Sequence, residues 1–307
     1  MSEVFNMPKL TFIVLSYNHS EYIKECIDSI LAQSYKDIEI VIVDDHSNDK
    51  SVEIIQKIIN SNQTNIKMEL VVHKRTKGVL ASIFDGISIA NGKFISCINP
   101  QEKLLKDFAL THIGIHLFNP TSLTVCEVCE IDENSTLLSL ISDVSQKEQN
   151  GDVIRDIRIK MSNIKNNNVI KILDKKTNFF GGWWWAPISC AVFKKETIMP
   201  LLSFDKTDNW RAQAERFLFN FLHLVDGSVK IYEPLVAYRR YEFGNKYKIF
   251  DNNQHEIQKN LFNDMIYFFK KEKDELIKHY SKQNYSKYLR EIYLSIPRLI
   301  KYKLFRR

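Results

Sequence analysis

Long apolar runs are absent from this sequence of 307 residues. No segment approaches the roughly 20 apolar residues that a membrane-spanning helix needs. Residues 1–8 lack the charged region that opens a signal peptide, and the apolar run at 11–15 is too short for its hydrophobic segment. These absences predict a cytoplasmic protein.

Cysteine is scarce, and its odd count of five argues against a disulfide framework. We expect reduced, buried thiols. Cys126 and Cys129 form one CxxC inside the alternating segment TVCEVCE. Residues three apart on a strand point to opposite faces, so a strand is favoured over a zinc or redox site.

Acidic residues are scarce near the end of the chain. Residues 278–307 hold nine Lys or Arg and one Glu, a net charge of +8, whereas the whole chain carries +6. Residues 296–307 alternate bulky apolar and basic side chains, which suits a peripheral anchor on the inner face of the cell membrane. A disordered basic tail is the alternative. No nucleic-acid-binding motif is present, so no nucleic-acid partner is expected.

Apolar periodicity predicts an α/β protein. Strands are expected at residues 10–15, 38–43, 68–72, 93–98 and 229–231, and helices after Ser20 as N-cap, after 49, and at 79–90, 211–224 and from about 253. Strands that alternate with helices indicate βαβ units and a parallel sheet. A boundary near 245 divides the prediction into a domain at 1–245 and a basic helical extension at 246–307.

Polar residues follow the first two predicted strands directly. Ser16-Tyr17-Asn18 ends the first, and Asp44-Asp45 ends the second. Ligands of a parallel sheet bind at the carboxyl ends of its strands. A carboxylate can accept hydrogen bonds from a nucleobase and a ribose, and a tyrosine can stack on the base. Both aspartates could equally be loop caps.

These motifs resemble the opening of the family 2 glycosyltransferases, in which Ser/Thr/Pro-Tyr-Asn and Val-Asp-Asp-x-Ser-x-Asp occupy the same places. Gly78 and Gly92, residues 190–195 and residues 231–239 extend the similarity over about 9–245. The resemblance implies a GT-A-like, mostly parallel sheet flanked by helices and followed by a helical extension. It also implies a nucleotide sugar donor, foremost a UDP-sugar.

The candidate residues for the nucleotide sugar lie at the ends of four predicted strands. They are Ser16, Tyr17, Asn18, Asp44, Asp45, Lys77, Gly78, Asn99, Gln101 and Glu102. Lys77 is included because it follows the third strand at the ligand edge, where a solvated loop is the alternative.

The chain departs from the family at the metal motif. Asn99-Pro100-Gln101-Glu102 replaces Asp-x-Asp, and neutral amides are poor ligands for Mg²⁺ or Mn²⁺. No metal ligands are therefore predicted, and Mg²⁺ or Mn²⁺ is kept as the alternative cofactor. The diphosphate leaving group still needs positive charge. The basic residues available for it are Lys77, Lys103, Arg216, Arg239 and Arg240.

Glu215 is the candidate general base, which would take the proton of the acceptor hydroxyl. The alternative is an exposed glutamate on a helix. Asp208 is a second candidate, and Asp208-Asn209 also suits a helix N-cap. Trp183, Trp184 and Trp185 could stack on the acceptor, or they could belong to a core strand.

The sequence therefore predicts a glycosyltransferase that moves a sugar, with inversion, to a glycan or a lipid-linked acceptor. Many bacterial relatives use lipid-linked acceptors, which suits assembly of cell-surface polysaccharide or lipopolysaccharide. The alternative is a degenerate GT-A domain that acts as a carbohydrate-binding or scaffold subunit.

Overall fold

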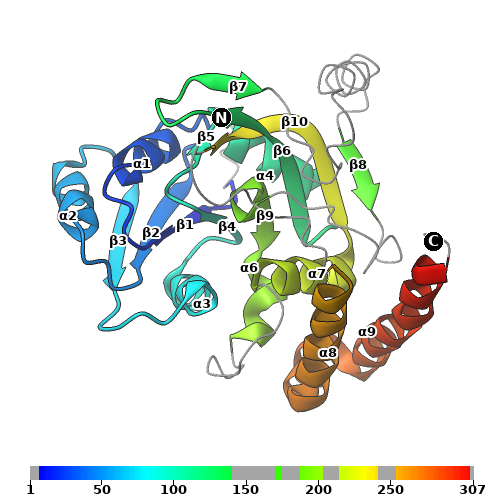
Figure 1. Cartoon of the computed structure of the whole chain (residues 1–307). Coiled ribbons are helices and arrows are strands. Elements are labelled where there is room, and N and C mark those ends of the chain that lie inside the picture. Colours follow the sequence, from blue (N-terminus) through cyan, green and yellow to red (C-terminus); the bar gives the residue numbers. More distant parts are fainter. Residues whose placement is uncertain (1–6, 140–169, 174–186, 203–213, 241–253, 305–307) are drawn as a thin grey trace, which may run out of the picture.

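The computed structural model describes residues 7–139, 170–173, 187–202, 214–240 and 254–304. Within these ranges, residues 171, 173, 214, 216, 254–262 and 293–304 are described by their backbone alone. Figure 1 shows a central sheet with helices on both sides and the last two helices at one end.

The described strands join in one mixed sheet. They are β1 (Leu10–Ser16), β2 (Ile38–Asp44), β3 (Lys67–Val72), β4 (Phe94–Ile98), β5 (Lys103–Leu104), β6 (Leu123–Ile131), β7 (Leu137–Ser139), β8 (Ile170–Leu173), β9 (Ala191–Lys194) and β10 (Ser228–Arg239). The order is β3-β2-β1-β4-β9-β6-β10-β5, with β7 paired to β6 and β8 to β10. Strands β3, β2, β1 and β4 are parallel, whereas β9 runs antiparallel to both of its neighbours.

The helices connect and flank these strands. They are α1 (Ile23–Leu31), α2 (Ser51–Ser61), α3 (Val79–Ile89), α4 (Phe108–Phe118), α6 (Lys195–Ile198), α7 (Ala214–Asp226), α8 (Gln254–Lys271) and α9 (Lys273–Leu304), with 3₁₀ turns η1 (Ile188–Cys190) and η2 (Met199–Leu201). No helix in the described part of the chain combines the length and apolar character needed to cross a bilayer.

The α/β prediction is confirmed, and two local predictions are wrong. Ser20 does not cap α1, which begins at Ile23 after Tyr22; the Ser20 N–H instead donates to Asp49. The short strand expected at 229–231 is the twelve-residue β10. Its pairing with β6 shifts register on both sides of Pro234, because proline has no N–H for the ladder.

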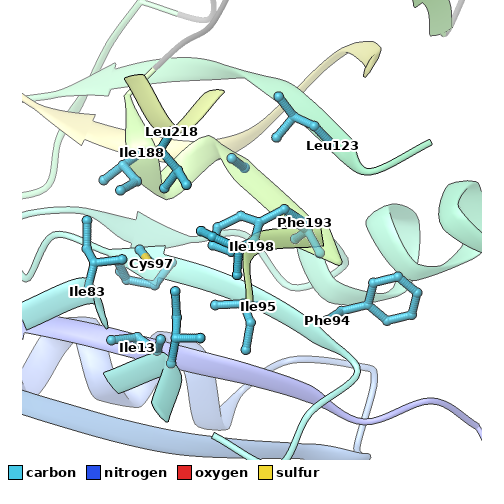
Figure 2. Packing of buried hydrophobic residues seen from close by; sticks show 14 of the residues in the cluster. Ile13, Ile83, Phe94, Ile95, Cys97, Leu123, Ile188, Phe193, Ile198 and Leu218 are labelled. Atoms are coloured by element: carbon cyan, nitrogen blue, oxygen red, sulfur yellow. The ribbon is translucent and has the colours of Figure 1, made fainter. Parts of the chain in front are cut away.

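Apolar side chains on both faces of the first strands form the core. All residues of β2 and β4 are buried, as a strand covered on both faces requires. Helix α3 lies close to β1: a Cβ added at Gly86 would approach Ile13 Cγ2 to 2.6 Å. Figure 2 shows Ile13, Ile83 and Cys97 within this packed layer. The rigid core fixes where each strand ends, and so where the loops begin.

The C-terminal helices share this core. In α8, the Phe268 ring meets Phe217 and Phe221 of α7 edge to face, with 5.7 Å between ring centroids. Phe269 and Tyr280 contact Phe221 as well. The boundary near 245 falls among residues 241–253, outside the described part, and stays a prediction. The helices beyond it pack on α7 as part of one apolar cluster.

The cysteine-bearing segment is a strand, as predicted. Cys126 and Cys129 are both buried in β6. All five cysteines are buried free thiols. Burial raises the pKa of Cys97 and Cys190, which keeps these thiols protonated and unreactive.

Candidate active site

The loops that follow β1, β2, β3 and β4 lie along one edge of the sheet, because these strands are parallel. Residues predicted to hold the nucleotide sugar fall in all four loops. The hydrogen bonds among them define the geometry of this edge.

Asp44, fully buried at the end of β2, joins the first two loops. Its Oδ2 accepts hydrogen bonds from the hydroxyls of Ser16 (2.9 Å) and Ser47 (2.6 Å), and Oδ1 accepts from the Ser47 N–H (2.8 Å). Both carboxylate oxygens thus have protein donors. Asp44 shapes the site, as the loop-cap interpretation expects.

Asp45 joins β2 to the loop after β3. Its carboxylate accepts the backbone N–H groups of Lys77 (2.7 Å) and Gly78 (2.8 Å), and Oδ1 lies 2.7 Å from His73 Nδ1. Gly78 has a φ of 91°, which favours glycine before α3. The carboxylate therefore fixes the entry to α3.

The buried ring of His73 lies between two carboxylates. Its Nε2 is 3.1 Å from Asp85 Oδ2, which is close enough for an ion pair. The two atoms are not aligned for a hydrogen bond. Lys77 Nζ pairs with the same Asp85 oxygen at 2.8 Å. Sequence analysis missed His73 and Asp85, which carry no motif and are brought together only by the fold.

Tyr17 and Asn18 are exposed residues of this edge. The Tyr17 side chain is 47% exposed, so its ring is accessible for stacking. Asn18 adopts a φ of 56°; its N–H donates to Ser47 Oγ, and its Oδ1 accepts from the Asn48 N–H, both at 2.9 Å. The Tyr17 N–H donates to His19 Nδ1 at 3.1 Å. Burial lowers the pKa of His19 against the opposing effect of nearby carboxylates, which favours the neutral ring.

Hydrogen bonds within the loop after β4 and to Ser189 fix the conformation of this loop. The Asn99 Oδ1 accepts the Gln101 N–H at 3.1 Å, and the Asn99 N–H donates to Ser189 Oγ at 2.9 Å. Glu102 is buried, and its Oε2 has no hydrogen-bond partner. Burial raises the pKa of Glu102 to about 8, against a hydrogen bond from Ser189 and with a further increase from the charge of Glu215. The Glu102 carboxyl is therefore mostly protonated at pH 7.

Glu215 opens α7 and reaches the same region. Its charge raises the pKa of Cys97 at the end of β4 as well as that of Glu102, although burial is the larger cause for both. The glutamate is half-buried, and not fully exposed as the alternative interpretation expects. The structure thus brings the candidate base beside the loop at 99–102.

The residues of this loop do not fit a divalent cation. Mg²⁺ and Mn²⁺ bind several hard oxygen ligands, preferably carboxylates. The Asn99 amide oxygen already accepts a hydrogen bond, and the Glu102 carboxyl is buried and protonated. The Glu102 oxygen that lacks a hydrogen-bond partner is too little on its own to hold a metal ion, so the proposed chemistry uses none.

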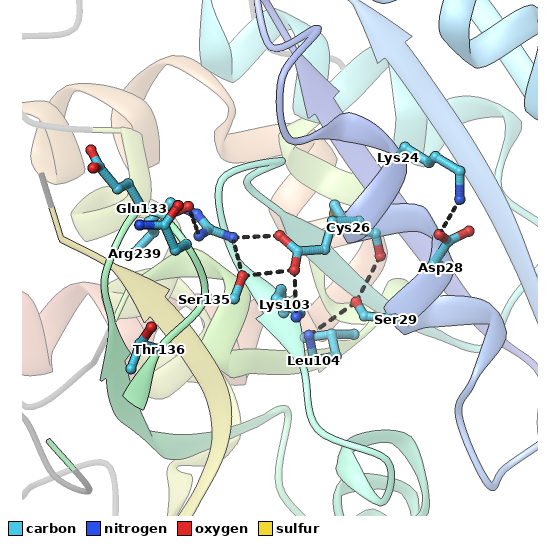
Figure 3. A network of polar contacts seen from close by, with 12 residues as sticks. Lys24, Cys26, Asp28, Ser29, Lys103, Leu104, Glu133, Ser135, Thr136 and Arg239 are labelled. Carbon is cyan, nitrogen blue, oxygen red and sulfur yellow. Dashed lines mark hydrogen bonds and ion pairs between the residues drawn. The ribbon is translucent and has the colours of Figure 1, made fainter. Parts of the chain in front are cut away.

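A second network, centred on Glu25, also contacts this loop through Arg239 (Figure 3). Glu25 accepts from Arg239 Nη2, Lys103 Nζ and the Ser135 hydroxyl. Arg239 also donates to the carbonyls of Asp132 (2.8 Å), Glu133 (2.8 Å) and Gln101 (3.3 Å), and it stacks on Tyr22, 4.6 Å from the ring centroid. Residues from α1, β5, β10 and the turn after β6 thereby meet.

This network changes the assignment of the basic residues. The Arg239 side chain is 1% exposed, so its charge is buried within the protein. Arg239 is therefore a structural residue and not a diphosphate contact. Lys77 pairs with Asp85, and Arg240 pairs with Glu130 at 3.0 Å. The side chain of Arg216 lies outside the described residues.

Four predicted site residues also lie outside the described residues. They are Asp208, Trp183, Trp184 and Trp185.

Known proteins that are similar in sequence to this chain are glycosyltransferases. The family model for glycosyl transferase family 2 matches residues 11–180, more than half of the chain. An uncharacterised glycosyltransferase of Haemophilus influenzae is 31% identical over 119 residues, 39% of this chain and 46% of that protein. The putative glycosyltransferase EpsH of Bacillus subtilis is 30% identical over 148 residues, 46% of this chain and 40% of that protein.

The fold has solved counterparts. The Staphylococcus aureus protein TarS, residues 1–349 in complex with UDP, aligns with a TM-score of 0.57 at 11% identity, over 84% of this chain and 65% of that one. The likeness identifies the fold as GT-A. The chain belongs to glycosyl transferase family 2. The matched part of the chain covers less than two thirds of the length of these curated relatives.

Proposed function

We propose that this chain transfers a sugar from a nucleotide sugar, foremost a UDP-sugar, to a glycan or a lipid-linked acceptor. The observation that carries the proposal is the meeting of two groups of residues at one sheet edge. The nucleotide side consists of Tyr17 and the loops tied by Asp44 and Asp45, and the acid–base side consists of Glu215 beside Glu102.

The chemistry follows from these positions. The acceptor oxygen forms a bond to the anomeric carbon, and the bond from that carbon to the diphosphate oxygen breaks, so the electron pair leaves with the diphosphate. Glu215 takes the acceptor proton, and attack from the opposite side inverts the configuration. Asp208 is the second candidate for this base, and Trp183, Trp184 and Trp185 are the proposed stacking surface for the acceptor.

The proposed setting is assembly of cell-surface polysaccharide or lipopolysaccharide at the inner face of a membrane. Chondroitin synthase of Pasteurella multocida is 27% identical over 106 residues, 11% of that protein. The basic end of the chain, residues 278–307, is the proposed contact with anionic lipids. Replacing Lys301, Lys303, Arg306 and Arg307 by Gln should abolish sedimentation of the full chain with anionic vesicles. Unchanged sedimentation would argue against this contact.

Calorimetric titration with UDP, GDP, CMP and dTDP, each with Mn²⁺ and with EDTA, tests the proposed function. We expect UDP to bind equally well in both conditions, because the loop after β4 does not fit a metal. Binding that requires Mn²⁺ would contradict the assignment of Asn99 and Glu102. Absence of binding to every nucleotide would favour the alternative, a degenerate GT-A domain that serves as a carbohydrate-binding or scaffold subunit.

A further inference from the structure

Two cations share one carboxylate beside the loop at 99–102. Glu25 is the ion-pair partner of both Arg239 and Lys103. Its own pKa is lowered: burial opposes ionisation, but the hydrogen bonds from Lys103 and Ser135 and the charges of Lys103 and Arg239 outweigh it. The three charged side chains therefore carry a net charge of +1.

Neither neighbouring acid pairs with these cations among the described residues. Asp132 directs its carboxylate to the N–H groups of Asn134 (2.9 Å) and Thr136 (2.7 Å) in its own turn. Glu102, next to Lys103 in the chain, is buried and mostly protonated. In the described part of the chain, Glu25 is therefore the carboxylate that the two cations share.

Lys103 is the member of the cluster that can move. Arg239 is enclosed by Tyr22, by three carbonyls and by Glu25. The Lys103 side chain is 31% exposed, and its ammonium group contacts Glu25 alone among the described residues. An ammonium group has three donors, so Lys103 can offer N–H groups to a ligand while Arg239 stays paired with Glu25.

The position of Lys103 is also fixed by the fold. Its backbone pairs with Ala237 in the short antiparallel contact between β5 and β10, so the residue is held directly after the loop at 99–102. While Glu102 turns towards Ser189, Lys103 turns towards α1 and Glu25.

We propose that Lys103 binds the diphosphate of the nucleotide sugar, with Glu25 as its counter-ion in the free protein and Arg239 as the cation that balances Glu25 when Lys103 turns to the ligand. This inference rests on the proposed function and supplies the positive charge that the loop at 99–102 lacks. The ammonium group stabilises the electron pair that leaves with the diphosphate. Lys77 and Arg240 are separately paired with Asp85 and Glu130.

The test compares UDP with uridine, which lacks the diphosphate. Binding is measured in EDTA by calorimetry for UDP and by ligand-observed NMR for uridine, with wild type, Lys103→Met, Lys103→Arg and the control Lys24→Met. Lys24 is an exposed residue of α1 paired with Asp28. We expect Lys103→Met to weaken UDP binding at least tenfold and uridine binding less than twofold. Lys103→Arg should retain UDP affinity within about threefold, and Lys24→Met should match wild type.

The outcomes separate this inference from the proposed function. If wild type binds UDP and Lys103→Met binds it equally well, the role of Lys103 is wrong while the proposed function stands. If Lys103→Met loses UDP and uridine to the same degree, Lys103 only supports the fold, and the inference is again overturned. If wild type binds neither ligand nor any other nucleotide, both proposals fail.

Discussion

The carboxylate of Asp45 accepts the backbone N–H of Gly78 at 2.8 Å, across 33 residues of sequence. The same carboxylate accepts the Lys77 N–H and contacts His73. It thereby binds the end of β2 to the start of α3. The loop that joins β3 to α3 borders the proposed nucleotide site, so the shape of this border depends on the Asp45 side chain.

Asp45→Asn should lower the free energy of unfolding by about 1–3 kcal/mol, because an amide has one acceptor oxygen for three donors. Urea unfolding measures the loss. Asp37→Asn is the matched control: Asp37 pairs with Lys9 at the surface, and its loss should cost less than about 1 kcal/mol. Equal losses in the two variants would show that the Asp45 contacts contribute no more than a surface pair.

Acid should destabilise the fold through His116. Burial lowers the pKa of His116 to about 4, against a hydrogen bond to the Val192 carbonyl, whereas the unfolded value is 6.5. The unfolded chain therefore binds a proton that the folded chain does not, and stability falls as the pH drops from 6.5 towards 4. The expected loss is about 3 kcal/mol.

His116→Gln tests this pH dependence. Urea unfolding at pH 7 and pH 4.5 should show a smaller acid-induced loss in the variant than in wild type. Burial also lowers the pKa of His112, so some acid sensitivity should remain. Parallel curves for variant and wild type would mean that His116 does not titrate as its burial requires.

Glu102 should act in the opposite direction. Its folded pKa of about 8 lies above the unfolded value of 4.5, so its stabilising contribution is complete below pH 4.5 and is lost as the pH rises through 8. Glu102→Gln removes this dependence. Between pH 5 and pH 8, the free energy of unfolding should therefore fall by about 3 kcal/mol more in wild type than in the variant. A constant difference across this range would show that Glu102 is already ionised in the folded protein.

The sheet was predictable, but the network behind the site was not. Short, mostly apolar runs such as 10–15 and 38–43, bounded by turn residues, are typical of strands covered on both faces, so their carboxyl ends, with Asp44 and Asp45, could be predicted from the sequence. Glu25 looks like any polar residue on an amphipathic helix. Its partner Arg239 lies 214 residues away, and no local pattern relates the two.

Two further differences have local causes. Proline disfavours a strand, so the sequence predicts an end before Pro234, whereas β10 continues past it by shifting its pairing with β6. Ser20 has the right chemistry for a cap, but both its side chain and its backbone N–H are hydrogen-bonded to Asp49, and α1 begins three residues later. In both cases a tertiary partner prevails over local preference.

The helical extension should unfold together with the sheet. Phe268 is fully buried between Phe217 and Phe221, and Phe268→Ala should cost about 3–5 kcal/mol. The neighbouring Tyr267 is 50% exposed, and Tyr267→Ala should cost less than about 1 kcal/mol. Circular dichroism and tryptophan fluorescence should report one coincident transition in urea for all three proteins. Separate transitions would indicate that α8 and α9 fold as an independent unit.

Glu215→Gln should separate turnover from binding. Glutamine keeps the shape of the side chain but cannot take the acceptor proton, so turnover should fall by about 100- to 10,000-fold while UDP affinity stays within about threefold. Turnover is measured as UDP release from UDP-sugars with a cell-envelope acceptor fraction, and binding by calorimetry. Asp226→Asn, at the other end of α7, is the control and should match wild type. Unchanged turnover in Glu215→Gln would exclude Glu215 as the base and direct the same experiment to Asp208, because the loop at 99–102 offers only the buried and protonated Glu102 for this role.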